Sequence, residues 1–147
     1  MITRYPETVL TFNGEPPLFV DLRVPVTQRE RDSLQAMGMQ TSFAVVTACN
    51  PMGKNISDAE NEQRSRLLEA ELVSSRERFV RVDACSPDKS HCEPSVAVKT
   101  SLERAVEIAK QYDQVAIFWF DGAEFWIEPV LGPATRMRLP ARDRPRP

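Results

Sequence analysis

The stretch Phe43-Ala-Val-Val-Thr-Ala-Cys-Asn-Pro51 decides the predicted fold, because it joins an apolar strand to an abrupt polar end. Its first seven residues are almost wholly apolar and include several β-branched side chains, which predicts a buried strand over 42–49. Pro51 is expected to hold Asn50 in extended geometry and to stop the pairing of the strand. We therefore expect the strand to end at an asparagine that faces a loop.

The stretch Ser57-Asp-Ala-Glu-Asn61 follows a short loop and predicts a helix over 57–75. Its first and fourth residues have the spacing of a capping box, in which each side chain binds a backbone N–H of the first turn. Asn61 lies on the same helical face as Leu68 and Leu72, which should pack on the sheet. Because a buried amide needs hydrogen-bond partners, we expect Asn61 to find them just behind the strand end.

The order of elements from residue 42 onward is strand, helix, strand, strand, helix, strand and a hairpin strand after the Asp121-Gly122 turn. This order predicts the α+β class, with a ferredoxin-like βαββαβ core, an added C-terminal hairpin strand and an N-terminal ββα extension. The further strands are expected over 8–12, 17–24, 78–84, 94–99, 115–120 and 125–127, and the further helices over 27–37 and after Thr100, whose spacing to Glu103 is that of a capping box.

The strands Phe43–Val46 and Val115–Phe120 do not alternate apolar with polar residues, which predicts burial on both faces of the sheet. The two crossover helices would cover one face only. We expect the N-terminal hairpin to extend or cover the sheet, with a homodimer contact over any surface that is left.

The composition indicates one globular domain. A chain of 147 residues can bury a core, and fractions of 41% hydrophobic and 27% charged residues are ordinary for globular proteins. We assign residues 1–131 to a single α+β domain and residues 132–147 to an Arg/Pro-rich tail that is expected to be disordered. The tail is basic and the rest of the chain is acidic, which argues against nucleic acid as a partner. No apolar run reaches membrane-spanning length and no leader opens the chain, so we expect a cytoplasmic protein without a membrane partner.

Cys49, Cys85 and Cys92 form no C-x-x-C pair, and their odd number again suggests a reducing cytoplasm. The spacing of Cys85, His91 and Cys92 matches no standard zinc pattern and lacks a fourth ligand, so we predict no metal site and no cofactor. In an oxidising setting, a Cys85–Cys92 disulfide that closes the hairpin is favoured over metal. His91 is the only histidine, and its place in a polar loop favours a solvated side chain over a catalytic one.

Right-handed crossovers would place the first core strand between the third and the fourth, antiparallel to both. The end of the first strand then lies beside the beginnings of the third and fourth strands and of the helix from residue 57. Polar side chains converging at such an edge are the usual form of a small-ligand site. The candidate binding residues are Thr47, Asn50, Asn61, Glu93, Ser95 and Gln114, with Lys54 ahead of a helix N-terminus as a candidate for binding phosphate or carboxylate.

Three functions are compatible with these residues, and we favour the first, the binding or sensing of a small polar, nucleotide-like ligand. The second is a hydrolase or transferase in which Glu93 is a general base and Asn50 or Asn61 stabilises an oxyanion. The third is a protein-interaction or inhibitor module that presents the aromatic residues of segment 119–126 as anchors. Against all three stands a purely structural role, in which strand-end polar groups satisfy the backbone and the aromatic residues belong to the core.

Four motifs of the chain resemble the bacterial family of uncharacterised proteins catalogued as domain of unknown function 3293. The motifs are Val46-Thr-Ala-Cys-Asn-Pro51, Ser57-Asp-Ala-Glu-Asn61, Glu93-Pro-Ser95 and Gln114 before an apolar strand. The likeness covers roughly residues 5–130 and leaves the tail outside. It implies the boundaries of the fold and the location of a site, and it implies no reaction.

Overall fold

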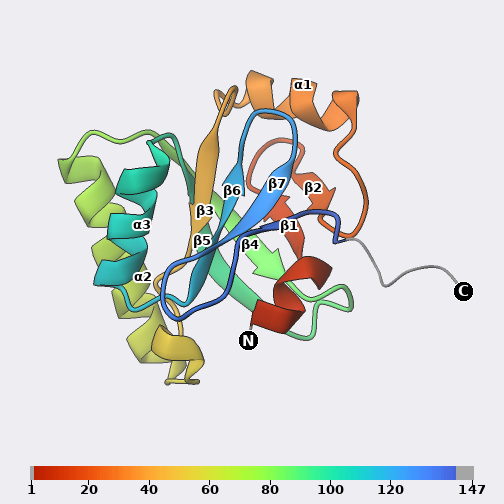
Figure 1. Cartoon of the computed structure of the whole chain (residues 1–147). Helices are drawn as coiled ribbons and strands as arrows, with labels where there is room; N and C mark the ends of the chain where they lie inside the picture. Colours follow the sequence, from red (N-terminus) through yellow and green to blue (C-terminus); the bar gives the residue numbers. More distant parts are fainter. Residues whose placement is uncertain (1, 142–147) are drawn as a thin grey trace, which may run out of the picture.

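The computed structural model describes residues 2–141, which form three α-helices and one eight-stranded sheet (Figure 1). The strand order is β2-β1-β4-β5-β3-β6-β7-β8, and every neighbouring pair is antiparallel. The predicted α+β class is confirmed. The strands are β1 (Val9–Phe12), β2 (Leu18–Asp21), β3 (Phe43–Val46), β4 (Phe79–Cys85), β5 (Cys92–Val98), β6 (Ala116–Phe120), β7 (Phe125–Pro129) and β8 (Met137–Arg138); the helices are α1 (Gln28–Ala36), α2 (Asp58–Ser74) and α3 (Leu102–Gln111), with short 3-10 segments η1 (Ile2–Glu7) and η2 (Pro51–Gly53).

β3 lies between β5 and β6 and is antiparallel to both, as the order of elements predicted. Val46 of β3 pairs with Val96 of β5, and Phe43 pairs with Phe120 of β6. Because β3 runs opposite to its neighbours, its C-terminal end lies beside the beginnings of β5 and β6. The first turn of α2 reaches the same edge, where it binds the residues that follow β3.

Two of the three predicted helix caps are confirmed. Thr27 and Ser57 each accept a hydrogen bond from the backbone N–H three residues later, and the glutamate at that position accepts the N–H of the cap residue. The third helix begins one residue later than predicted, because Ser101 rather than Thr100 is its N-cap. The Ser101 hydroxyl accepts from the N–H of Arg104 at 3.1 Å, which satisfies a donor that the first turn would otherwise leave free.

α2 and α3 cover one face of the sheet (Figure 1). Leu68 and Leu72 of α2 and Ile108 of α3 share a buried cluster with Ala44 and Val46 of β3. Within residues 2–141, neither these helices nor α1 are long and apolar enough to cross a membrane.

The second face is also closed, because the sheet curls and brings its outer strands over its middle. The ring of Phe43 packs with those of Phe12 in β1 and Phe125 in β7, with centroids 6.0 and 5.9 Å apart. Leu34 of α1 and Leu139 join the same cluster. The prediction that both faces are buried is therefore confirmed. Since the chain itself closes this face, the expectation of a homodimer loses the physical reason on which it rested.

Residues 137–139 correct the prediction of a disordered tail from residue 132 onward. Met137 and Arg138 form β8 beside β7, and Leu139 is only 2% exposed in the core. The backbone N–H of Leu139 donates to the carbonyl of Phe125 at 2.8 Å. Residues 142–147 of the predicted tail lie outside the described residues.

The arginines around β8 explain why composition was misleading there. Arg136 and Arg138 lie over the ring of Trp126, with guanidinium carbons 4.3 and 5.5 Å from its centroid. Both also pair with glutamates of the final hairpin, so their charges have partners within the fold. Phe125 is 1% exposed. The aromatic side chains expected as interaction anchors are therefore engaged within the chain.

Candidate functional site

A compact polar network forms where β3 ends, and Asn50 is its centre. The backbone N–H of Asn50 donates to Asn61 Oδ1 at 2.8 Å, and Asn61 Nδ2 donates to Asn50 Oδ1 at 2.9 Å. Asn50 Oδ1 also accepts the N–H of Ile56 at 3.2 Å, which ties the following loop to the same side chain. The two asparagines therefore bridge the strand end to the start of α2, as the sequence predicted for Asn61.

The backbone of Asn50 corrects the expectation of extended geometry before Pro51. Its dihedral angles, φ 48° and ψ 66°, are left-handed, and Met52 is left-handed as well with φ 56°. Asparagine tolerates this conformation better than most residues, because its short amide bonds to local backbone groups. The preference of a residue before proline is a bias, and the three hydrogen bonds between Asn50 and its neighbours Asn61 and Ile56 overcome it.

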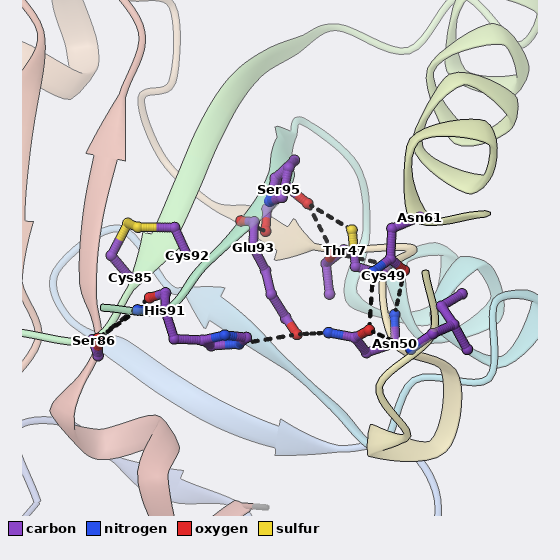
Figure 2. A network of polar contacts seen from close by, with 12 residues as sticks. Thr47, Cys49, Asn50, Asn61, Cys85, Ser86, His91, Cys92, Glu93 and Ser95 are labelled. Carbon is purple, nitrogen blue, oxygen red and sulfur yellow. Dashed lines mark hydrogen bonds and ion pairs between the residues drawn. A yellow bond between two sulfur atoms is a disulfide. The ribbon is translucent and has the colours of Figure 1, made fainter. Parts of the chain in front are cut away.

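Glu93 continues the network into the interior of the curled sheet. Asn50 Nδ2 donates to Glu93 Oε2 at 2.9 Å, and His91 Nε2 lies 3.6 Å from the same oxygen. Figure 2 shows the resulting row of His91, Glu93, Asn50 and Asn61, contributed by the β4–β5 hairpin, the end of β3 and α2. Within the described residues, no group donates to the other carboxylate oxygen, Oε1 of Glu93.

Three other predicted binding residues are buried or half-buried beside this row, but their side chains form hydrogen bonds with backbone groups. Thr47 Oγ1 donates to Pro94 O at 2.8 Å, and Ser95 Oγ donates to Glu93 O at 3.1 Å. Gln114 Nε2 donates to the carbonyl oxygens of residues 49 and 112, at 2.9 and 3.1 Å. For these side chains the structural role applies, because they fix the strand ends around the site.

A cavity of about 380 Å³ opens beside Glu93, on the face of the sheet away from α2 and α3. Its volume is at the small end of the range for ligand pockets. Residues of β3, β6, the N-terminal segment and the β4–β5 hairpin surround it. The lining residues are Tyr5, Glu7, Thr8, Val45, Thr47, Asn50, Gly53, Ala84, Cys85, Ser86, Pro87, Ser90, His91, Glu93, Ser95, Gln114, Val115, Ala116, Ile117 and Phe118.

Five of the seven predicted residues therefore line one cavity, namely Thr47, Asn50, Glu93, Ser95 and Gln114. Asn61 lies behind Asn50 and holds it from outside the lining. Lys54 is exposed and is not among the lining residues, so the structure does not bring it to this cavity, and anion binding by Lys54 stays a prediction. Lys54 follows the short η2 turn, and the capping box of α2 already occupies the backbone N–H groups of Ser57 and Glu60 at the start of that helix.

The sequence did not indicate Tyr5 as a residue of the site, and it favoured a solvated His91 with no part in the site. Tyr5 lines the cavity and packs on Phe118, with ring centroids 5.4 Å apart. Burial, and secondly the charge of Glu93, raise the pKa of Tyr5 to about 12, so its hydroxyl is protonated at neutral pH. His91 is exposed, as predicted, yet it lines the cavity next to Glu93. Nothing in the local pattern around Tyr5 indicated its position, because the curl of the sheet brings it there.

Cys85 and Cys92 form a disulfide between β4 and β5, close to His91 (Figure 2). This corrects the expectation that all cysteines are reduced, and it matches the alternative pairing considered for the hairpin. Cys49 is buried and free. Within the described residues, no group of three or more His, Cys, Asp or Glu side chains is arranged to hold a metal ion.

Arg64 of α2 is a further residue that the pattern did not reveal. Its guanidinium donates to the carbonyl oxygens of Ala48 and Tyr112, each at 2.6 Å. These two carbonyls belong to the segments that leave β3 and enter β6. Arg64 therefore clamps together the two chain segments that carry Asn50 and Gln114.

Residues 46–117 match the model of a family described as a protein of unknown function, DUF3293. Over this segment the chain is similar to the DUF3293 family. The match confirms the resemblance drawn from the sequence, and it contains Asn50, Asn61, Glu93 and Gln114. The strands β1, β2, β7 and β8 lie outside it. No curated protein and no solved structure matches the chain.

Proposed function

We propose that the cavity binds a small molecule that carries an N–H or ammonium donor on an apolar or aromatic body. The observation that carries this proposal is the carboxylate of Glu93, which lines the cavity: Asn50 holds one of its oxygens, and within the described residues no group donates to the other. A carboxylate accepts hydrogen bonds only, so its free oxygen favours a donor in the ligand. Val45, Ile117 and Phe118 supply apolar surface for the rest of the molecule.

The charges around the cavity narrow the class of ligand further. Glu7 and Glu93 are acidic, and no lysine or arginine lines the cavity among the residues whose side chains are described. A phosphate group would lie near these carboxylates without a cationic partner, which is unfavourable. The nucleotide-like ligand expected from the sequence is therefore narrowed to a base, a nucleoside or an aromatic amine.

The two alternative functions have less support. Oxyanion stabilisation needs donors that are free, whereas Asn50 Nδ2 donates to Glu93 and Asn61 Nδ2 donates to Asn50. An interaction module needs exposed anchors, whereas Phe125 is buried and Trp126 lies under two arginines. Binding requires neither feature.

The test is titration calorimetry with two matched pairs of compounds. Tyramine and ethylphenol share an aromatic body, but only tyramine carries an ammonium group; adenosine and its monophosphate differ by the phosphate. We expect tyramine to bind about tenfold more tightly than ethylphenol or better, because a hydrogen bond to a charged group contributes about 1.5–3 kcal/mol. Adenosine should bind more tightly than its monophosphate.

Glu93→Gln should remove the preference for tyramine while leaving the fold intact. Glu103→Gln is the matched control, because Glu103 is an exposed carboxylate of α3 far from the cavity lining. Equal binding of tyramine by the Glu93→Gln variant and the wild type would contradict the assigned role of Glu93. If neither tyramine nor adenosine binds at millimolar concentration, the proposed function is wrong.

A further inference from the structure

The disulfide closes the segment that forms one wall of the cavity. Cys85 and Cys92 are register partners at the end of the β4–β5 hairpin, and the segment 85–93 includes six of the cavity's lining residues. His91 and Glu93 flank Cys92 directly along the chain. Any movement of Cys92 is therefore transmitted to both of the ionisable groups on that wall.

The two sulfurs are held unequally by their surroundings. Cys85 is 5% exposed and lies in the packed interior, whereas Cys92 is exposed. Two thiols cannot remain at the distance of a covalent S–S bond, so reduction must separate the sulfur atoms. Because close-packed interiors resist displacement, the exposed Cys92 side takes up most of the shift.

The loop has its own hydrogen bonds, which keep it folded when the bond is broken. Ser86 N donates to His91 O at 2.8 Å, and Asp88 Oδ1 accepts from the N–H of Ser90 at 3.0 Å. We therefore expect a shifted and looser hairpin after reduction rather than an unfolded one.

We propose that the Cys85–Cys92 disulfide is a redox clasp: oxidised, it holds His91 and Glu93 in place at the cavity, and reduced, it releases them and weakens ligand binding. This inference rests on the proposed function of the cavity for its effect on affinity. A thiolate of a dithiol reductant attacks one sulfur, and the S–S bond breaks as a mixed disulfide forms. The second thiol of the reductant then displaces the remaining cysteine. The protein gains two electrons and two protons as two thiols, and the reductant becomes a disulfide.

The experiment compares oxidised protein with protein reduced by dithiothreitol, using tyramine as the probe in calorimetry. We expect the affinity to fall about tenfold on reduction, the change that corresponds to losing one hydrogen bond to a charged group. In parallel, hydrogen exchange and the ring resonances of His91 are recorded without any ligand. Amides of segment 86–93 should exchange faster after reduction, whereas those of α3 should not change.

The Cys85→Ser/Cys92→Ser double variant is the control. It should bind tyramine like the reduced protein and should not respond to dithiothreitol, while Cys49 stays free in both proteins. If this variant does not fold, the reduced wild-type protein, with three free thiols counted by a thiol reagent, supplies the comparison.

The outcomes separate the clasp from the proposed function. Equal tyramine affinity in the two redox states overturns the clasp. Unchanged exchange in 86–93 and unchanged His91 resonances overturn it as well, whether or not any probe binds. If exchange and resonances change but no probe binds either form, the clasp stands and the assigned ligand class falls.

Discussion

Asn61→Leu should destabilise the protein far more than an ordinary substitution on a helix surface. Leucine has the same number of side-chain heavy atoms as asparagine, branched at the same carbon, and it suits a helix, so shape and propensity predict little change. However, Asn61 makes two hydrogen bonds to Asn50, one to its backbone N–H and one to its side-chain oxygen. Asn50 is 8% exposed, so water has little access to replace them.

The magnitude follows from these two bonds. Leaving the buried N–H of Asn50 without an acceptor costs about 1–3 kcal/mol, and losing the second bond costs about 1 kcal/mol. Asn50 Oδ1 keeps the N–H of Ile56, so it adds no further penalty. We expect a loss of about 2–4 kcal/mol in the free energy of unfolding. For a chain of this size, each kcal/mol lowers Tm by about 2–4 °C.

Urea denaturation of three variants measures this effect. Gln63→Leu is the matched control, because Gln63 is exposed two positions along the same helix, and it should change stability by about 0.5 kcal/mol or less. Asn61→Asp keeps an acceptor for the Asn50 N–H and should recover part of the loss. The reasoning fails if Asn61→Leu is as stable as Gln63→Leu, since Asn50 would then need no partner.

Three other outcomes are expected. In urea denaturation, Leu139→Ala should lower the free energy of unfolding by about 2–5 kcal/mol, because Leu139 is buried. Met137 is exposed, so Met137→Ala should lower it by about 0.5 kcal/mol or less, and equal effects would contradict the buried position of Leu139. A spectrophotometric titration should show Tyr5 ionising near pH 12 as the later of the two tyrosines, and Tyr5→Phe should remove that step. Because this folded-state pKa lies above the unfolded value of about 10, the stability that Tyr5 contributes is fully present below pH 10 and is lost as the pH rises toward 12. Over that pH range the Tyr5→Phe variant should lose less stability than the wild type. Arg64→Leu should lower the free energy of unfolding by about 2–3 kcal/mol, because two backbone carbonyls lose their donor. Arg64→Lys should recover little of this loss, because one ammonium group cannot match the guanidinium fork, and wild-type stability of either variant would refute the clamp.

The parts of the site that were predictable from sequence are those set by local pattern and strand order. The apolar run of β3, the capping box at Ser57 and the succession of elements were sufficient to place the end of β3 beside the starts of β5 and β6. That placement brings Asn50, Asn61 and Glu93 together. Each step used contacts within a few residues or a general rule about crossovers, so no long-range detail was needed.

The cavity itself was not predictable, because it depends on how the sheet curls. Its far wall comes from Tyr5 and the residues after it, which are distant in sequence from β3 and carry no pattern that points to a site. The position of Lys54 away from the cavity was not predictable for a related reason, since the path of a short turn depends on backbone angles that sequence spacing does not give. The tail was misjudged because composition counts arginines but not the glutamates and tryptophan that they meet.

Within the polar row, Asn50 and Asn61 stabilise the end of β3, whereas the Glu93 carboxylate is the group proposed to bind a ligand. The N–H, Oδ1 and Nδ2 groups of Asn50 all form hydrogen bonds, and both the oxygen and the nitrogen of the Asn61 amide bind Asn50. Closing the loop would need only the pair of asparagines, but the left-handed backbone of Asn50 also presents its Nδ2 to Glu93. That conformation costs about 1–2 kcal/mol, which the three hydrogen bonds to Asn61 and Ile56 offset. Its effect is to hold Oε2 of Glu93, while no hydrogen bond within the described residues engages Oε1. A purely structural network would have no reason to extend to a carboxylate at a cavity, and this extension is why the row supports a binding site.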